Sequence, residues 1–359
     1  MAEIDKFFRK MIELGASDLH LMTGLPPKIR KSGSLVPFEG EPEIDKDTMN
    51  NLLKEICTED KWEFFKENLD LDFAYEIEGL SRFRANYLNT IHGPGAVFRT
   101  IPTEILTLEQ LSLPEIFKEV CSYDRGLVLV TGPTGSGKST TLAAMINYIN
   151  ENYTKHIITI EDPLEFVHPN KKSVIVQREV GDQTNSFNNA LKGAMRADPD
   201  IVLVGEMRDP ETISLALSCA SMGLLVFGTL HTNNAPKTID RVIGAFPAEE
   251  QSQIRTMLAE SLVCVISQLL CKTTDGKRCA SHEILLRHSA LPNLIREGQL
   301  NNIRSIIESS GGQGMKLMDK DLLRLFSEGR IDVVEAYMKA ADKTLFQDRL
   351  PADFFDHEH

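Results

Sequence analysis

The stretch that decides the fold covers residues 126–139 and reads Gly-Leu-Val-Leu-Val-Thr-Gly-Pro-Thr-Gly-Ser-Gly-Lys-Ser. Its first half is an apolar run that predicts a buried parallel strand. Its second half matches the pattern G-x-x-x-x-G-K-[ST] completely. A helical stretch, 139–150, follows and would present its amino end to an anion. Strand, glycine-rich loop and helix in this order predict an α/β domain that binds a nucleoside triphosphate.

Each residue type in this loop has a physical role. Glycine tolerates positive φ angles and lets a phosphate approach the backbone N–H groups closely. Lys138 supplies a point charge for the β- and γ-phosphates, and Ser139 offers its hydroxyl to Mg²⁺ as a metal ligand. The residues expected to bind the nucleotide are Gly132, Pro133, Thr134, Gly135, Ser136, Gly137, Lys138, Ser139 and Thr140.

The composition is that of an ordinary globular protein. The chain has 359 residues, enough for two domains with separate cores. An apolar content of 42% and a charged content of 25% are typical of globular proteins. The formal charge is −13, from 39 basic and 52 acidic residues. This charge counts against a general nucleic-acid binder, so no nucleic-acid partner is expected.

Two further features bear on location and on metals. No apolar run approaches the roughly 18 residues that span a bilayer, and the polar start lacks the apolar core of a signal peptide. We therefore expect a cytoplasmic location. The six cysteines form no CxxC pair, so we expect buried free thiols and no four-ligand zinc site. Cys271 and Cys279 flank a polar stretch that predicts a hairpin turn.

Residues 1–100 mix helical and strand patterns. An apolar face between Ile4 and Leu14 predicts a first helix, and helical patterns also fill about 45–67. Ser32-Gly33-Ser34 predicts a hairpin turn. Together the patterns predict a smaller α+β domain with an antiparallel sheet. Its expected strands include residues 18–22, 69–77, 82–90 and 96–100.

Residues 101–115 carry prolines near both ends and predict a linker to a second domain that covers 116–359. In the second domain strand and helix patterns alternate, which predicts a doubly wound parallel sheet. After about residue 245 the pattern is mostly helical. The strands expected in this sheet are 126–131, 156–160, 173–176, 200–204 and 224–229.

Two candidate catalytic side chains follow strands of this sheet. Glu206 ends the apolar run 201–206. In nucleotide hydrolases an acid at the carboxyl end of a strand lies near Mg²⁺ and its waters. His231 follows the strand at 224–229, and its place at another strand end favours a site near the γ-phosphate.

A third strand end carries a cluster of acids. Glu161, Asp162 and Glu165 follow the strand at 156–160. One of these carboxylates could polarise an attacking water or hold Mg²⁺ through a water. A solvated acidic turn before Pro163 would have the same sequence, but three acids beside a phosphate-binding loop favour function.

Arginines form a further candidate group in the first domain. Arg82, Arg84 and Arg99 lie in its strand patterns, and strand alternation puts Arg82 and Arg84 on one face. A guanidinium from a neighbouring subunit can stabilise the charge of a transferring phosphoryl group. The same pattern fits a solvent-exposed basic face, and the residues alone do not decide between the two.

Several motifs occur together, and in order, in one family. On them the chain resembles the type IV pilus retraction ATPases, the PilT-like branch of the secretion ATPase superfamily. The resemblance runs from residue 16 to 243, with a weaker similarity at 314–319. The stretches that carry it are Ala16-Ser-Asp-Leu-His-Leu21, Arg82-Phe-Arg-Ala-Asn86, Gly132–Ser139, Ile160-Glu-Asp-Pro-Leu-Glu-Phe166, Arg196-Ala-Asp-Pro-Asp200, Val204-Gly-Glu-Met-Arg-Asp209, Gly228-Thr-Leu-His-Thr232 and Asp240-Arg-Val-Ile243.

The resemblance implies a PAS-like amino-terminal domain, a RecA-like carboxyl-terminal domain and a ring of six subunits that uses ATP and Mg²⁺. It implies that Glu165 is the catalytic glutamate, Glu206 the Walker B acid and His231 the second histidine of the histidine box. It also implies a ring beneath an inner-membrane pilus platform protein, where hydrolysis drives filament disassembly. The arginines that the family places near a nucleotide between subunits match Arg82, Arg84 and Arg99.

Three features distinguish this chain within the family. Assembly-type relatives usually carry four zinc-binding cysteines late in the second domain, whereas only Cys271 and Cys279 occur here, which favours the retraction branch. Leu224 stands where the histidine box has its first histidine. Pro292 replaces an arginine of the retraction signature, although proline fits the first turn of a helix.

We therefore expect a hexameric, Mg²⁺-dependent ATPase that powers pilus retraction. Leu224 and Pro292 motivate a second hypothesis, an accessory paralogue that acts with a main retraction motor. A RecA-like motor on nucleic acid is a third hypothesis, and the net charge counts against it. A nucleotide-binding regulator without turnover is a fourth. Glu165 and Glu206 count against it, since binding alone needs neither carboxylate.

Overall fold

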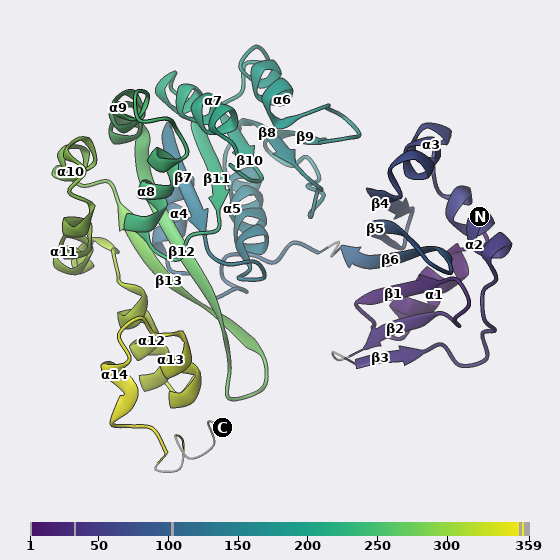
Figure 1. Ribbon diagram of the computed structural model, residues 1–359. Helices are drawn as coiled ribbons and strands as arrows, with labels where there is room; N and C mark the ends of the chain where they lie inside the picture. Colours follow the sequence, from purple (N-terminus) through teal and green to yellow (C-terminus); the bar gives the residue numbers. More distant parts are fainter. Residues whose placement is uncertain (1, 32–33, 102–103, 352–353, 355–359) are drawn as a thin grey trace. The chain divides into compact units, whose positions relative to one another are not determined.

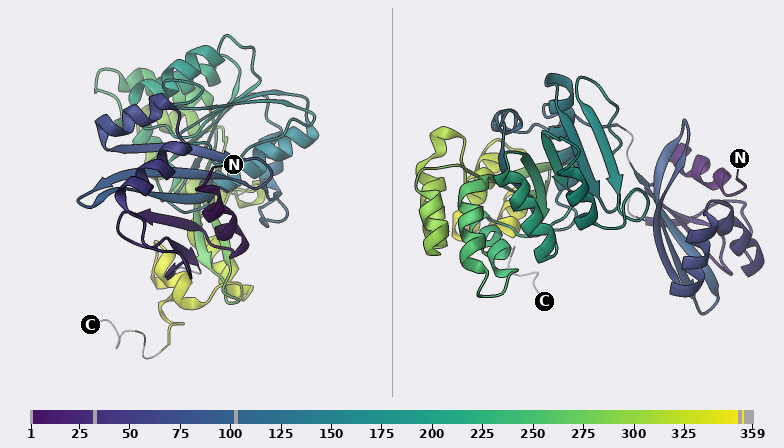
Figure 2. Two further views of the ribbon diagram at one scale, coloured as in Figure 1. Left: turned by 90° about the vertical axis from the view of Figure 1, so that its right-hand side faces the viewer. Right: turned by 90° about the horizontal axis from the view of Figure 1, so that it is seen from above.

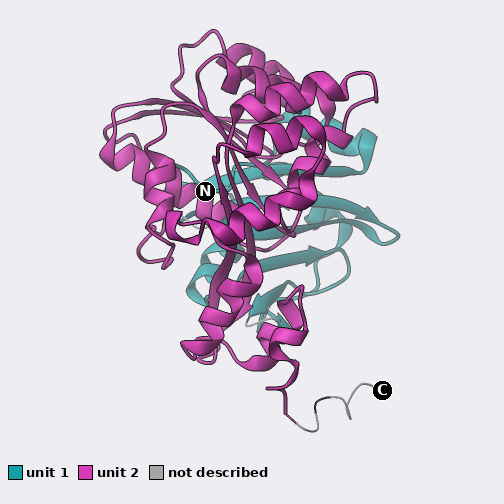
Figure 3. Cartoon of the chain, turned by 90° about the vertical axis from the view of Figure 1, so that its left-hand side faces the viewer, with its two compact units in different colours: residues 1–104, 163–167 teal, residues 105–162, 168–359 magenta. Residues whose placement is uncertain are grey.

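The computed structural model describes residues 2–31, 34–101, 104–351 and 354, and the chain forms two compact units (Figures 1 and 3). The first unit comprises Met1–Glu104 and the short segment Pro163–Val167. The second comprises Ile105–Asp162 and His168–His359. Residues 105–115, which the sequence assigns to a linker, group with the second unit, and Leu108 is buried in its core.

The first unit is a six-stranded sheet with helices packed against it. The strand order is β3-β2-β1-β6-β5-β4, and each neighbouring pair is antiparallel. The ring centroid of Phe8 lies 4.4 Å from that of Phe83 and 4.8 Å from that of Phe98. This α+β architecture was expected; the turn expected at Ser32-Gly33 lies outside the described residues. The elements are α1 (Asp5–Glu13), β1 (Asp18–Met22), β2 (Lys28–Lys31), β3 (Ser34–Pro37), α2 (Lys46–Glu55), α3 (Glu59–Asn68), β4 (Asp70–Ile77), β5 (Ser81–Thr90) and β6 (Gly93–Ile101).

The second unit is built on a seven-stranded sheet of order β13-β12-β7-β11-β10-β8-β9 (Figure 1). Neighbours from β12 to β9 are parallel, and β13 pairs antiparallel to β12 at the edge. The five parallel strands expected from the sequence are confirmed with small shifts at their ends. The strands are β7 (Gly126–Thr131), β8 (His156–Glu161), β9 (Val174–Glu179), β10 (Ile201–Val204), β11 (Leu225–Leu230), β12 (Leu262–Lys272) and β13 (Arg278–Leu286).

Helices cover both faces of this sheet (Figure 2). The chain moves along the sheet in one direction from β7 to β8, and in the other from β9 through β10 to β11. Since crossovers between parallel strands are right-handed, α5 covers one face together with α4, while α6 and α7 cover the other. The helices are α4 (Ile116–Cys121), α5 (Lys138–Asn152), α6 (Phe187–Ala194), α7 (Pro210–Ser221), α8 (Ala235–Gly244), α9 (Gln251–Ser261), α10 (Leu291–Glu297), η1 (Leu300–Asn302), α11 (Ile303–Ser309), η2 (Gly311–Gln313), α12 (Met318–Ser327), α13 (Val333–Lys339) and α14 (Thr344–Gln347).

The expectation of a mostly helical chain after about residue 245 is wrong for residues 262–286. There β12 and β13 form a long hairpin in which Cys271 pairs with Cys279, as the expected turn requires. The first seven residues of β12, 262–268, are all buried, and its pairing with β7 runs from Leu262 to Ser267. A strand buried on both faces loses the polar–apolar alternation that distinguishes it from a helix, so its periodicity carried no signal.

The remaining expectations on cysteines and membranes concern absences. All six cysteines are free. Five are buried, as expected, whereas Cys57 is only half-buried. Within the described ranges, no group of three or more cysteine, histidine or acidic side chains could hold a metal ion. No helix in the same ranges is long and apolar enough to cross a membrane.

Candidate functional site

The glycine-rich loop joins β7 to α5 at the carboxyl edge of the sheet. A Cβ on Gly132 would lie 2.3 Å from the carbonyl oxygen of Gln268 and 2.5 Å from Oγ of Ser136, so the packing requires glycine there. The loop also requires unusual backbone conformations, which glycine adopts freely. The φ angles are +148° at Gly132, +77° at Gly135 and +86° at Gly137.

The polar groups of the loop fit a phosphate. Lys138 is only 9% exposed, and its Nζ donates to the carbonyl oxygens of Gly132 at 2.8 Å and Pro133 at 3.2 Å. The Ser136 hydroxyl oxygen is buried and has no hydrogen-bond partner among the described residues. Ser139 lies half-buried in the first turn of α5, where its hydroxyl is the oxygen donor that Mg²⁺ prefers. The predicted phosphate-binding residues 132–140 therefore comprise the loop and the first turn of α5.

Glu206 and His231 meet at this edge of the sheet. Since β7, β11 and β10 are parallel neighbours, their carboxyl ends lie together. Nε2 of His231 lies 3.0 Å from Oε1 of Glu206, and Nη2 of Arg208 lies 2.7 Å from Oε2. The hydrogen bond from Arg208 lowers the pKa of Glu206 despite partial burial of the carboxyl group. Glu206 is thus ionised at neutral pH, which the expected role of a metal-side acid requires.

The backbone around Glu206 has a specific packing. A Cβ on Gly228 would lie 2.4 Å from Sδ of Met207, so the glycine makes room for that buried side chain. The N–H of Met207 donates to the carbonyl of Thr229 at 3.1 Å, and the Thr229 hydroxyl donates to the carbonyl of Gly205. These contacts tie the end of β10 to β11 and hold Glu206 beside His231.

Glu165 belongs to the first unit, on the segment Pro163–Val167, whereas the loop and Glu206 belong to the second. Its neighbours Leu164 and Phe166 are buried, and Glu165 itself is exposed. The other acids of that cluster remain in the second unit. There Glu161 accepts a hydrogen bond from the Thr159 hydroxyl at 2.9 Å, and Asp162 is exposed.

The three candidate arginines lie in the sheet of the first unit. Arg84 on β5 pairs directly with Arg99 on β6, and Arg99 pairs with Asp18 on β1, so these side chains share one face. Asp18 is buried, which disfavours its charge, but hydrogen bonds from Ser17 and Arg99 outweigh that and lower its pKa. Each arginine has an acidic partner: Arg82 with Glu76 at 3.6 Å, Arg84 with Asp72 at 3.6 Å and Arg99 with Asp18 at 2.8 Å.

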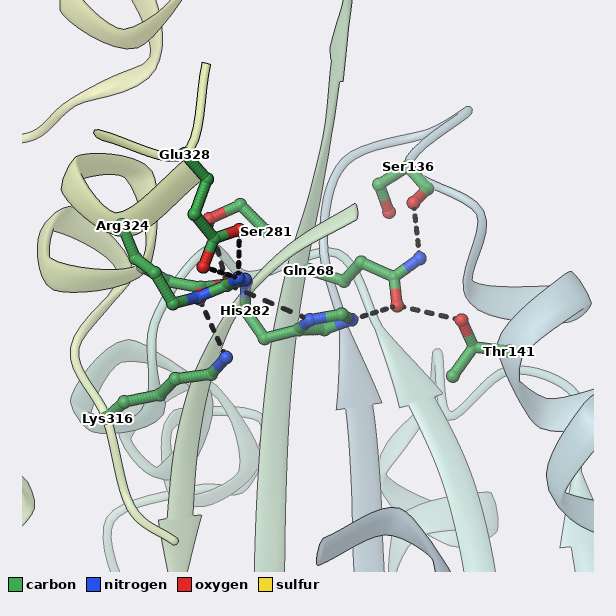
Figure 4. Close-up of polar contacts among 9 residues, drawn as sticks. Ser136, Thr141, Gln268, Ser281, His282, Lys316, Arg324 and Glu328 are labelled. Atoms are coloured by element: carbon green, nitrogen blue, oxygen red, sulfur yellow. Dashed lines mark hydrogen bonds and ion pairs between the residues drawn. The ribbon is translucent and has the colours of Figure 1, made fainter. Parts of the chain in front are cut away.

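Sequence patterns assigned no role to three residues that contact the site directly or through one neighbour. Arg208 follows Glu206 by two positions and contacts its carboxylate. Gln268 and His282 are distant from the loop in sequence, yet Gln268 contacts it directly (Figure 4). The available signal was a polar pair, Ser267-Gln268, inside the apolar run of β12.

The two departures from the family pattern lie away from this edge. Leu224 immediately precedes β11, at the end of the sheet opposite His231; its carbonyl accepts a hydrogen bond from the N–H of Gly126 at 3.0 Å. Its side chain packs against the core of the unit. Pro292 lies in the first turn of α10, as its ring geometry predicts.

Parallel strands with a phosphate-binding loop and an ionised acid at one edge define a nucleoside triphosphatase of the P-loop class. The particular family follows from comparison with known proteins. The family model described as type II/IV secretion system protein matches residues 2–339, so the chain belongs to that family.

Within the family the chain is PilT-like. It is 52% identical over 326 residues to the type IV pilus retraction ATPase PilT of Pseudomonas aeruginosa, covering 91% of this chain and 94% of that one. It is 54% identical over 306 residues to a twitching motility protein of Neisseria gonorrhoeae, covering 85% and 82%. To the type IV pilus ATPase PilU of P. aeruginosa it is 40% identical over 339 residues, covering 94% and 88%.

A solved structure agrees with this assignment. The crystal structure of the pilus retraction motor PilT with bound ADP has a TM-score of 0.90 to this chain at 41% identity, and 97% and 99% of the two chains are covered. The expected fold class and the expected ATPase of the retraction branch are thereby confirmed.

Proposed function

We propose that this protein is a hexameric, Mg²⁺-dependent ATPase that powers type IV pilus retraction and hence twitching motility. The observation that carries the proposal is that the phosphate-binding loop, Glu206 with Arg208, and His231 follow the carboxyl ends of the neighbouring parallel strands β7, β10 and β11. Similarity to a retraction ATPase over nine-tenths of the chain supports it. Bound Mg²⁺ would neutralise charge on the β- and γ-phosphates.

Each residue of the nucleotide site has its own role in binding or hydrolysis. Lys138 and the loop N–H groups bind the phosphates of ATP, and Ser139 and Glu206 hold Mg²⁺ and its waters. His231, fixed by Glu206, faces the γ-phosphate. Glu165 acts as the catalytic glutamate and polarises the attacking water.

The arginines of the first unit supply positive charge for the transferring phosphoryl group. We propose that they reach a nucleotide bound by a neighbouring subunit in the ring and stabilise the transferring phosphoryl group. Their place together on one sheet face, each with an acidic partner, is consistent with that role. The domains 1–100 and 116–359 then rotate as rigid bodies during turnover. The arginines concerned are Arg82, Arg84 and Arg99.

The ring would work in the cytoplasm, peripheral to the inner membrane through its partner, a pilus platform protein. No nucleic acid takes part. A paralogous retraction ATPase is a further candidate partner. An accessory role is the second candidate function, because Pro292 departs from the retraction signature. The higher identity to PilT, 52% against 40% to PilU, favours the main motor.

Complementation tests the proposal. The chain is expressed in a P. aeruginosa strain that lacks its own PilT, with Lys138→Ala as the matched inactive variant. The proposal predicts that the parent chain restores surface twitching and that the variant does not. Failure of a well-expressed, ATP-hydrolysing parent to restore twitching would contradict the role of main motor and favour the accessory one.

A further inference from the structure

Gln268 is a buried polar residue on β12 to which the proposed function gives no role. It is 2% exposed. The preceding residue, Ser267, pairs with Thr131, the last residue of β7 before the loop, and their hydroxyl oxygens lie 2.8 Å apart. Gln268 therefore stands where the nucleotide loop leaves the sheet.

Gln268 approaches the loop at three places. The backbone carbonyl oxygen of Gln268 would lie 2.3 Å from a Cβ on Gly132. Its side-chain Nε2 would lie 2.9 Å from a Cβ on Gly137. Its Nε2 also donates to the carbonyl oxygen of Ser136 at 2.7 Å, while its Oε1 accepts the hydroxyl of Thr141 on α5 at 2.8 Å. One side chain thus ties both the loop and the following helix to β12.

The chemistry of the partners fixes the direction of these hydrogen bonds. The carbonyl of Ser136 can only accept, so the amide nitrogen of Gln268 faces it and Oε1 faces the other way. His282 lies directly opposite Gln268 on β13, with Nε2 3.1 Å from that oxygen, and therefore donates from Nε2. His282 is 2% exposed, and burial lowers its pKa to about 3, so its ring is neutral.

Asp321 on α12 anchors this histidine from the other side. Its Oδ2 accepts the backbone N–H of His282 at 2.8 Å and the hydroxyl of Ser281 at 3.3 Å. Its Oδ1 accepts from Lys316 at 2.8 Å and from Arg324 at 2.9 Å. Figure 4 shows these polar contacts running from α12 across the hairpin to the loop.

We propose that Gln268 is a positioning residue of the nucleotide site, and that His282 and Asp321 couple its hydrogen bonds to helix α12. The inference rests on the proposed function, because it takes the loop to bind a nucleotide. Gln268 holds the loop backbone so that its N–H groups face the phosphates. A change in the position of α12 is transmitted through Asp321 and His282 to this contact and changes nucleotide affinity.

Equilibrium binding of a fluorescent N-methylanthraniloyl ADP to the full chain tests the positioning role. Gln268→Met keeps the volume but leaves the Ser136 carbonyl without its donor. We expect its affinity to be lower by about tenfold or more, the effect of one buried hydrogen bond. Gln253→Met, at an exposed position of α9, is the control and should bind as the parent does. Thr141→Val should weaken binding more than Thr141→Ser, which keeps the hydroxyl.

The link to α12 is tested with the same probe. Asp321→Asn removes the negative charge to which Lys316 and Arg324 donate hydrogen bonds, and it should weaken binding of the fluorescent ADP. Combined with Gln268→Met, its effect should be less than additive, because both changes act on one network. His282→Gln keeps an N–H donor and should bind more tightly than His282→Leu.

The outcomes separate the two proposals. Failure of the parent chain to bind the fluorescent ADP would overturn the proposed function. If the parent binds and the folded Gln268→Met and Thr141→Val variants bind equally well, the positioning role is wrong while the proposed function stands. Unchanged affinity in Asp321→Asn would overturn the coupling to α12.

Discussion

Gly132→Ala gives a direct test of how tightly the nucleotide loop packs. The new Cβ would lie 2.3 Å from the carbonyl oxygen of Gln268 and 2.5 Å from Oγ of Ser136, distances that the backbone must relieve by moving. Overpacking of this kind typically costs about 1–3 kcal/mol. The positive φ angle of +148° adds about 1–3 kcal/mol for any residue with a Cβ.

Gly135→Ala is the matched control, because it separates the two costs. Gly135 also has a positive φ angle, +77°, but a Cβ there meets no atom within 4 Å. Both variants carry backbone strain, and only Gly132→Ala carries the clash. We therefore expect Gly132→Ala to lower the free energy of unfolding by about 1–3 kcal/mol more than Gly135→Ala.

Thermal unfolding of the nucleotide-free protein, followed by circular dichroism, measures the difference. For a unit of this size each kcal/mol lowers Tm by roughly 2–4 °C. Equal melting temperatures for the two variants would show that the loop is not packed against β12, and would refute the argument.

Three other predictions follow from the site. Glu206→Gln should reduce ATP turnover by roughly a hundredfold or more, and unchanged turnover in steady-state assays would remove its role as the metal-side acid. Arg84→Ala should change the free energy of unfolding by less than about 1 kcal/mol, because the ion pair of Arg84 with Asp72 is half-exposed. The same variant should lower ATP turnover by roughly a thousandfold. Unaffected turnover would indicate that the arginines form only a solvent-exposed basic face. The His282 pKa of about 3 lies below its unfolded value, so the stability from its neutral ring is present above pH 6.5 and is lost as the pH falls toward 3. His282→Gln should therefore flatten the pH dependence of unfolding between pH 6.5 and 4 by up to about 1.4 kcal/mol per pH unit, and a slope equal to the parent's would contradict this.

Local patterns predicted the parts of the site that lie close together in sequence. The loop, the helix behind it and Ser139 are contiguous, so their spacing alone determined their geometry. Glu206 and His231 were found because each ends an apolar run, and parallel strands bring such ends to one edge.

The contacts that local sequence patterns did not predict depend on strand register and on packing. Gln268 reaches the loop only because β12 pairs with β7, and the buried run of β12 lacked the alternation that would have predicted a strand. The pairing of Gln268 with His282, and the contact of Asp321 with the backbone of β13, are tertiary contacts that no local pattern contains.

Leu224 illustrates how the structure changes the reading of a sequence departure. As a departure from the histidine box it motivates the hypothesis of an accessory paralogue. In the structure it immediately precedes β11, and its backbone carbonyl accepts a hydrogen bond from the N–H of Gly126, the first residue of β7, at the edge opposite the loop. We therefore expect Leu224 to have no direct effect on the phosphates of a nucleotide bound by the loop of the same unit.

Steady-state ATP hydrolysis by the purified chain, with Mg²⁺ and with excess EDTA, tests the central claim most directly. Glu165→Gln is the matched variant. The account predicts clear turnover by the parent with Mg²⁺, loss of that turnover in EDTA, and its collapse in Glu165→Gln. A parent chain that binds ATP and Mg²⁺ but never hydrolyses, or a Glu165→Gln variant as active as the parent, would contradict it.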